Sequence, residues 1–297
     1  MKFVLAPVAI AATAVIGAEL LALLVVSTAG AAPAGQAIQF APHRAVYDIT
    51  LERAASGSGI IELTGRMVYD LQGSACEGFT QNMRFVTRMM SQDGSEQIND
   101  LRTSSWEQSE GRRLRFSSAQ YRDRELVDSA NGDARRRDGA VAVDVTTPKP
   151  AKIQLPRDVY FPMQHSAALV SAARDGLHQF VADLYDGSEK GVKVYRTSAM
   201  IGDRMSTHGL PARLANSETL MKVPSWPVAI SYFEDGALNR DAVPSYELSF
   251  NIFENGVSSR LVIDYGDFAV RGELSDLTYY ASSDCPAASQ GVEPKRP

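Results

Sequence analysis

Alternating apolar and polar residues, recurrent turn sequences and a single helical segment predict an all-β fold for this chain of 297 residues. We expect a large antiparallel sheet, and the single helix suggests that this sheet curls into a barrel whose end or interior the helix fills. Antiparallel sandwiches and barrels of this length commonly form one domain, and we place that domain at residues 35–285.

The strand pattern begins between Ala45 and Glu52, where apolar and polar residues alternate as in a half-buried strand. It continues from Ile61 to Met89 and is clearest between Tyr246 and Tyr265. Turn sequences rich in Gly, Asn, Asp and Ser separate the expected strands. They lie at Ser56–Gly59, Gln92–Gly94, Ser109–Gly111, Asn131–Asp133, Asp186–Ser188, Glu234–Gly236, Glu254–Gly256 and Tyr265–Asp267.

One segment departs from this pattern. From Met163 to Arg174 the apolar residues recur at helical spacing, with Phe161-Pro162 before them and Asp175-Gly176 after them. A lone amphipathic helix must pack its apolar stripe against something, so we expect it to cap or fill the curled sheet.

Both ends of the chain are predicted to lie outside the sheet domain. Residues 1–34 resemble a cleaved signal peptide, with Lys2 at the start, an apolar run from Phe3 to Val26 and small residues before the cleavage region. An uncleaved anchor helix is the alternative, and Glu19 within the run argues against it. No later segment is apolar enough to span a membrane, so we expect a periplasmic protein with no membrane span after cleavage. The polar, Pro-rich residues 286–297 are expected to be a disordered tail.

The chain has two cysteines, Cys76 and Cys285. An exported chain reaches an oxidising compartment, so we expect these two residues to form one disulfide. Unlinked thiols and a metal site are the alternatives. A metal site is disfavoured because neither cysteine has a Cys or His at ligand spacing, and redox catalysis is disfavoured because there is no C-x-x-C sequence.

Charge and motifs exclude several function classes. The net charge of −5 argues against nucleic acid as a partner. The sequence contains no phosphate-binding loop, dinucleotide fingerprint or nucleophile elbow. We therefore predict a non-enzymatic protein with no catalytic residue, no metal and no cofactor. The four histidines are expected to be structural or surface residues: His43, His165, His178 and His208.

Two charged patterns are given structural interpretations. The acidic residues around Gly187 match a hairpin turn better than a calcium loop. The arginines at 112–115 and 135–137 are interspersed with acidic residues, which favours a solvated strand face over a site for polyanions or lipid headgroups.

Four longer stretches resemble the EipB family of cell-envelope integrity proteins. They are Ala41–Leu51, Tyr160–His165, Leu184–Ser188 and Val262–Phe268. The resemblance covers nearly the whole expected mature chain and includes both cysteines. It implies a β-spiral, which is an open barrel-like sheet with a short helix, and a disulfide between Cys76 and Cys285. It also implies an exported alphaproteobacterial protein needed for envelope integrity, and it carries over no catalytic residue.

Two functions from different classes fit this expectation. The protein could act as a periplasmic scaffold or binding protein whose edges and loops dock other envelope components, with an interior filled by its own side chains. Alternatively, it could carry or sense a lipid or a lipoprotein acyl chain inside the curled sheet. The third hypothesis is a hydrolase without a recognisable motif. It ranks last because no nucleophile and base can be assembled from the sequence. The expected partners are therefore envelope proteins or lipids, and the ligand-binding residues cannot be named from sequence.

Overall fold

The computed structural model describes residues 37–138, 140–206, 209–211, 213–234 and 242–282. From Ile38 onward the contacts form one unit. The predicted signal peptide, the predicted tail, His208 and Cys285 lie outside the described residues, so those assignments stay predictions.

Fourteen strands of this described part form one antiparallel sheet. They are β1 (His43–Ala54), β2 (Ile60–Ser74), β3 (Gly78–Ser91), β4 (Glu96–Glu107), β5 (Arg113–Arg122), β6 (Glu125–Arg137), β7 (Ala140–Thr147), β8 (Ala151–Leu155), β9 (Gln179–Leu184), β10 (Tyr195–Ile201), β11 (Ser225–Phe233), β12 (Tyr246–Phe253), β13 (Ser258–Asp264) and β14 (Phe268–Tyr279). Two helices accompany them, α1 (Pro162–Arg174) and the single turn α2 (Ser217–Leu220). This arrangement confirms the predicted all-β, open barrel-like sheet.

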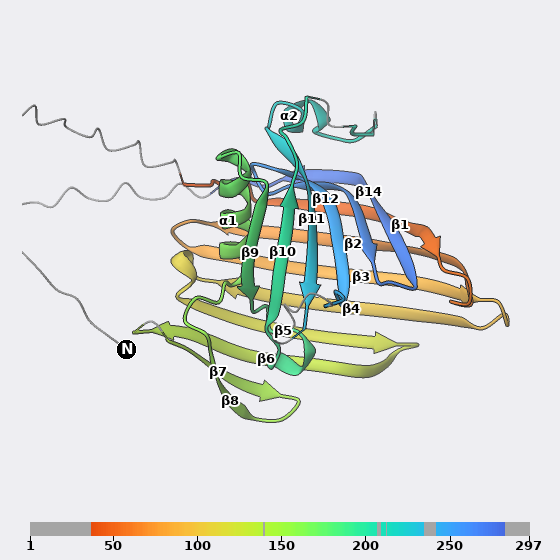
Figure 1. The fold of residues 1–297 in the computed structure, drawn as a ribbon, viewed down its shortest axis with the longest axis horizontal. Helices are drawn as coiled ribbons and strands as arrows, with labels where there is room; N and C mark the ends of the chain where they lie inside the picture. The colour runs from red at the N-terminus through yellow and green to blue at the C-terminus, as the bar shows by residue number, and fades with distance from the viewer. Residues whose placement is uncertain (1–36, 139, 207–208, 212, 235–241, 283–297) are drawn as a thin grey trace, which may run out of the picture. The chain divides into compact units, whose positions relative to one another are not determined.

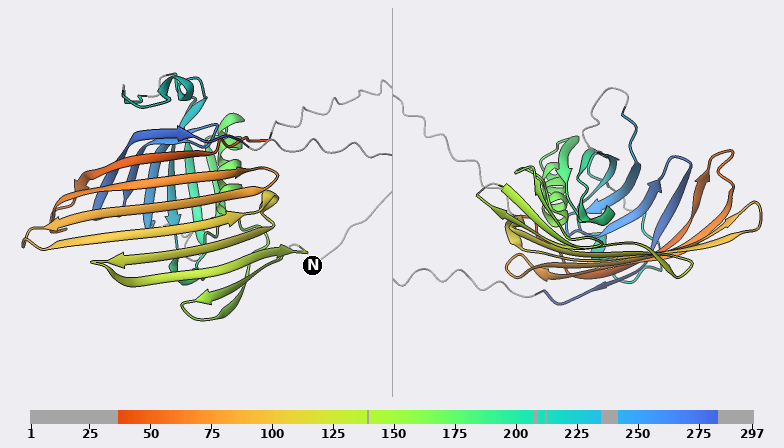
Figure 2. Two further views of the ribbon diagram at one scale, coloured as in Figure 1. Left: turned by 180° about the vertical axis from the view of Figure 1, so that it is seen from behind. Right: turned by 90° about the horizontal axis from the view of Figure 1, so that it is seen from below.

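The sheet consists of two meanders joined at one pair of strands. Strands β1 to β8 follow one another in sequence order, and β9 to β14 do the same. The pairing of β1 with β14 unites them, from His43 opposite Tyr279 to Ala54 opposite Phe268. In Figures 1 and 2 the strands of the second meander run across those of the first, so the sheet folds over on itself.

Side-chain alternation decides which face of the sheet is inside. On β1, Ala45, Tyr47 and Ile49 are buried, whereas Asp48 and Thr50 are exposed, as the sequence predicts. The buried faces of both meanders contribute to one core, against which the apolar residues of α1 also pack. The inner face of β1 to β4 and β9 to β14 therefore surrounds an interior.

The helix occupies the predicted position. It begins with Pro162, which is suited to a first helical position, and ends at Arg174. Its buried residues include Met163, Leu169 and Val170. The helix lies along one side of the folded sheet, next to β9 (Figure 1).

The free edges of the sheet are β8 and β9, and the chain segment between β8 and α1 connects them. The backbone N–H of Tyr160 donates to the carbonyl of Asp183 at 2.7 Å, and the N–H of Tyr185 donates to the carbonyl of Tyr160 at 2.9 Å. Beyond β9, Tyr185 is fully buried and its ring meets Phe116 of β5 edge to face at 5.7 Å. A second, smaller core forms here, over the inner face of β5 to β8. We call this closure the seam.

One predicted turn is wrong. Asn131–Asp133 lies inside β6, although its sequence is typical of a hairpin. Gly132 is needed there because the ring of Phe116 lies over it, and a Cβ atom would come within 2.4 Å of the ring. The chain reverses instead at Asp123 and Arg124, both with positive φ. Packing against a neighbouring strand, not turn formation, explains this glycine.

The close packing at the seam leads to a first testable prediction. Gly187 has a φ of +78°, and an added Cβ would lie 2.2 Å from the ring of Phe116. Gly176 has a similar φ of +74° but open space around it. Gly187→Ala should therefore lower the free energy of unfolding by roughly 1–3 kcal/mol more than Gly176→Ala. The Gly176→Ala variant suffers only the strain of placing an alanine at positive φ. Denaturant unfolding of both variants checks this, and equal losses would show that the seam is loosely packed.

Candidate functional site

The inner face of the folded sheet is not filled by side chains. Two hollows of about 380 Å³ and about 740 Å³ lie within it. They share residues from β2, β3, β12, β13, α1 and the β9–β10 connection, so they adjoin: Met67, Tyr69, Gln81, Met83, Pro162, Asp186, Tyr246, Leu248 and Ile263. We call the two together the interior hollow. Its size is that of a small-molecule or acyl-chain site.

Apolar side chains make up most of the wall of the smaller part, whereas the larger part also carries serine, threonine, glutamine and acidic side chains. The smaller hollow is lined by aliphatic and aromatic residues of β11 to β13 and by Met163 and Leu169 of α1. Met67 and Met83 line both hollows. Methionine side chains are flexible and adapt to ligands of irregular shape. The sequence places these residues on the inner strand faces by alternation alone, but nothing in it shows that the space between them stays open.

The start of α1 is fixed by a residue far away in sequence. Glu107, the last residue of β4, is 2% exposed. Its carboxylate accepts the backbone N–H groups of Met163 at 2.7 Å and Gln164 at 3.0 Å. Phe161 at the N-cap position has no side-chain cap of its own, so Glu107 satisfies the first turn instead. Burial raises the pKa of Glu107 to about 7, against the lowering effect of these two hydrogen bonds and of Arg136.

His165, on α1, has a structural role. It is 5% exposed, and its Nε2 lies 3.0 Å from Oγ1 of Thr197. Since the Thr197 hydroxyl donates to the carbonyl of Ala182, it accepts from His165. Burial lowers the pKa of His165 to about 4, so the ring is neutral at physiological pH. The sequence-based expectation of a satisfied structural histidine is confirmed here.

His43, at the start of β1, is different. It is fully buried, and its Nδ1 lies 2.7 Å from the carbonyl oxygen of Ala41, while its Nε2 has no hydrogen-bond partner among the described residues. The ring lines the smaller part of the hollow. The sequence offered no sign of this, because a histidine at the start of a strand is usually solvated.

The remaining sequence candidates lie outside the hollow or form turns. His178 is bonded through Nδ1 to the carbonyl of Ile201 at 3.0 Å. The Asp186 carboxylate accepts the N–H of Ser188 at 2.9 Å, as in the predicted turn. In the part of the chain that the structure describes, no group of three His, Cys, Asp or Glu side chains is arranged to hold a metal ion. Nor does any helix in those residues have the length and apolar character to span a membrane.

Cys76 lies in the turn between β2 and β3, next to Ser74, whose Oγ is 3.6 Å from its sulfur. Because Cys285 is beyond the described residues, the predicted pairing stays a prediction.

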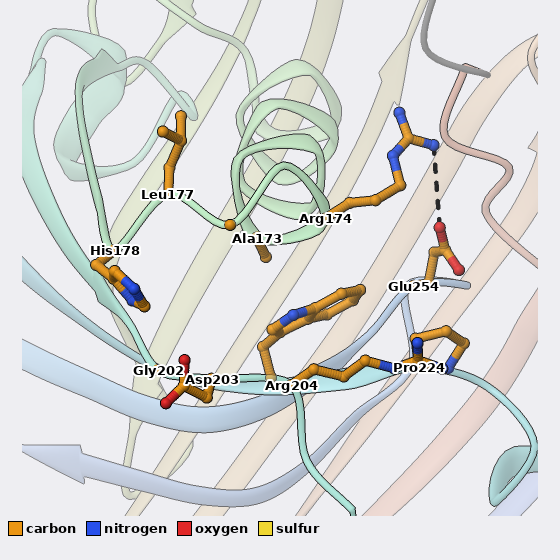
Figure 3. Close-up of a pocket in the computed structure, with 11 residues that line it drawn as sticks. Ala173, Arg174, Leu177, His178, Gly202, Asp203, Arg204, Pro224 and Glu254 are labelled. Atoms are coloured by element: carbon orange, nitrogen blue, oxygen red, sulfur yellow. Dashed lines mark ion pairs between the residues drawn. The ribbon is translucent and has the colours of Figure 1, made fainter.

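A separate pocket of about 350 Å³ opens at the end of α1 (Figure 3). It is more polar than the interior hollow, with an ion pair of 3.9 Å between Arg174 and Glu254 at its side. Trp226, which also lines this pocket, belongs largely to the core, with 5% of the residue exposed. Its charged groups are paired or solvent-facing, so it is a weaker candidate than the hollow.

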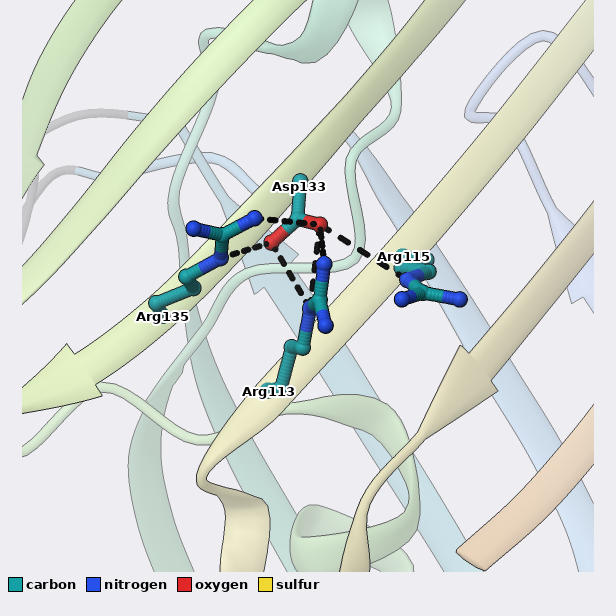
Figure 4. Close-up of polar contacts among 4 residues, drawn as sticks. All are labelled: Arg113, Arg115, Asp133 and Arg135. Atoms are coloured by element: carbon teal, nitrogen blue, oxygen red, sulfur yellow. Dashed lines mark hydrogen bonds and ion pairs between the residues drawn. The ribbon is translucent and has the colours of Figure 1, made fainter.

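The arginine-rich strands form a charge-compensated outer face. On β5 and β6, Asp133 is surrounded by Arg113, Arg115 and Arg135 (Figure 4). Burial opposes ionisation of Asp133, but the hydrogen bonds from Arg113 and Arg135 outweigh it and lower its pKa. The neighbouring inner positions, Leu114 and Ala134, belong to the core. Asp133 thus offsets one of the three positive charges around it, which agrees only in part with the predicted mixture of charges.

The comparisons with known proteins fit this geometry. The sequence profile described as EipB-like matches residues 34–281. This chain belongs to the EipB-like family. It is 38% identical over 252 residues to the cell envelope integrity protein EipB of Brucella abortus, covering 85% of this chain and 89% of that protein. It also resembles the crystal structure of a beta-barrel-like protein of a domain of unknown function from Brucella abortus. That match has a TM-score of 0.76 and 37% identity, and it covers 82% of this chain and all of the other.

Proposed function

We propose that this member of the EipB-like family is an exported periplasmic protein that supports cell envelope integrity by holding the hydrocarbon chain of a lipid or acylated protein. The observation that carries the proposal is the interior hollow, which is walled by apolar strand faces and by α1. An apolar cavity of this kind gains free energy when hydrocarbon replaces poorly hydrated space.

The envelope role is supported by the relative's name. The Brucella abortus protein is called a cell envelope integrity protein, and the similarity extends over most of both chains. The predicted signal peptide would bring this chain to the same compartment. A periplasmic protein with an apolar interior can shield a lipid chain between two membranes.

The scaffold hypothesis has less support. It expected an interior filled by the protein's own side chains, whereas the hollow is open to a ligand. The edge of β9 is also partly covered by Tyr160, which limits docking by strand addition on that side. The proposal assigns no reaction, since the buried His165 hydrogen-bonds Thr197, whose hydroxyl donates in turn to a backbone carbonyl.

Native mass spectrometry of protein purified gently from the periplasm tests the proposal. We expect a discrete added mass that organic solvent releases as a lipid or an acylated peptide. Protein that is free of added mass after gentle purification, and that binds no twelve-carbon amphiphile afterwards, would contradict it.

Met83→Trp offers a sharper test, because Met83 lines both parts of the hollow. A larger indole there should weaken binding of an apolar fluorescent probe by roughly tenfold or more. Thr64→Trp is the matched control, because Thr64 is an exposed residue of the adjacent strand β2 and lines neither part of the hollow. Equal binding by both variants, each folded by circular dichroism, would place the probe elsewhere.

A further inference from the structure

Among the described residues, every charged side chain that lines the interior hollow is acidic. No lysine or arginine is among the described residues that line either part. Four acidic residues line the larger part: Asp128, Asp186, Glu189 and Glu234. Asp186 alone also lines the smaller part. A ligand group that enters the hollow therefore meets carboxylates and no cation on its wall.

An aromatic cluster stands beside Asp186. Tyr232 and Tyr246 stack with ring centroids 4.3 Å apart, and Tyr195 meets each of them edge to face at 6.0 Å. Tyr232 and Tyr246 line the smaller part of the hollow together with Asp186. Burial, and next the negative charge of Asp186, raise the pKa of Tyr232. Aromatic faces next to a carboxylate are the usual surroundings of a bound ammonium group.

The protein already holds one ammonium group in this region. Lys193 Nζ lies 2.8 Å from Glu189, 2.5 Å from Glu234 and 5.1 Å from the ring centroid of Tyr195. Lys193 offsets one of these two negative charges, so the group of Lys193, Glu189 and Glu234 keeps a net charge of −1. Asp186 has no ion pair among the described residues, so its charge remains available to a ligand.

Two further side chains that line the hollow each have a buried polar atom without a hydrogen-bond partner among the described residues: Ser188 at Oγ and His43 at Nε2. A carbonyl oxygen only accepts, so the contact of His43 Nδ1 with Ala41 places the proton on Nδ1. Burial lowers the pKa of His43, which keeps the ring neutral and leaves Nε2 as a bare acceptor inside the protein. A buried acceptor without a donor is destabilising, and a donor on a ligand that reached this nitrogen would recover that cost.

We infer that the ligand of the interior hollow is an amphiphile whose polar end is an ammonium group, held by the Asp186 carboxylate beside the tyrosine rings. The inference rests on the proposed function and adds the chemistry of the ligand's polar end. An ammonium supplies positive charge to Asp186 and N–H donors to the acceptors on the wall. A carboxylate or phosphate end would meet the negative charge of Asp186 and no lysine or arginine among the described residues of the wall.

Three twelve-carbon probes that differ in one group test this: dodecylammonium, dodecanol and dodecanoate, each below its micelle concentration. Calorimetric titration at pH 7 and low salt should show dodecylammonium binding roughly tenfold or more tighter than dodecanoate. Asp186→Asn keeps an acceptor for the Ser188 N–H and removes the charge. It should weaken dodecylammonium binding by roughly tenfold and leave dodecanol binding unchanged.

Asp144→Asn is the control, because Asp144 is exposed and alternates with the buried Val143 and Val145 on β7. It changes the net charge equally and should leave all three affinities as they are. Dodecanoate binding as tightly as dodecylammonium, or an Asp186→Asn variant with unchanged preference, would overturn the inference and leave the proposed function standing. If none of the probes binds, the proposed function fails.

Discussion

Replacing Cys76 with serine should lower the free energy of unfolding by up to about 5 kcal/mol, the largest effect expected of any single change in this protein. The expected disulfide joins the turn after β2 to the segment beyond β14, and thus encloses almost the whole sheet. Closing so long a loop removes much of the conformational freedom of the unfolded chain. Thermal or denaturant unfolding of the oxidised protein measures the loss.

A double-mutant comparison separates a shared bond from two independent thiols. Cys285→Ser should match Cys76→Ser, and the double variant should be no worse than either. The wild-type protein should also run faster on a non-reducing gel than on a reducing one. Two alkylatable thiols in periplasmic protein, or a double variant clearly less stable than both single ones, would disprove the pairing.

The second large effect is expected at Glu107. Glu107→Ala should lower the free energy of unfolding by about 2–4 kcal/mol, because it leaves two backbone N–H groups at the start of α1 without an acceptor inside the protein. The helix is one wall of the hollow, so probe binding should weaken as well. Glu96→Ala is the control, since Glu96 is an exposed residue of the same strand paired with Arg88, and it should change stability little.

Because the pKa of Glu107 is raised, we also expect the free energy of unfolding to depend on pH. Its pKa is about 7 in the folded protein and 4.5 ordinarily, so between these values the folded state binds the proton that the unfolded state has lost. The free energy of unfolding should therefore fall by about 3 kcal/mol as the pH rises from 4.5 to 7, and level off above. Glu107→Gln does not titrate and should lack this slope. A wild-type slope that persists in Glu107→Gln would assign the effect to other groups.

Much of the fold could be predicted because it depends on local patterns. The alternation from Ala45 to Glu52 predicts the buried face of β1, and the turn at Glu254–Gly256 predicts the β12–β13 hairpin. The helical spacing from Met163 predicts α1 within one residue. Each of these signals is carried by neighbours in sequence.

The failures share a physical cause. Gly132 was interpreted as part of a turn because Asn-Gly favours one, but Phe116 needs the space above it. The closing of the sheet at Tyr160 and Tyr185 depends on backbone hydrogen bonds between segments with no pattern of their own. His43 gave no sequence signal, since its environment is set by strands that are adjacent only in space.

Strand faces and the position of the helix follow from the amino-acid sequence alone, because alternation and spacing specify which side chains are buried together. The three-dimensional fold was needed to show that the interior stays open, that Glu107 caps α1 and that Asp186 has no ion pair among the described residues. The physical reason is that cavities, caps from distant strands and ion pairs depend on distances between segments far apart in the chain, which no local pattern encodes.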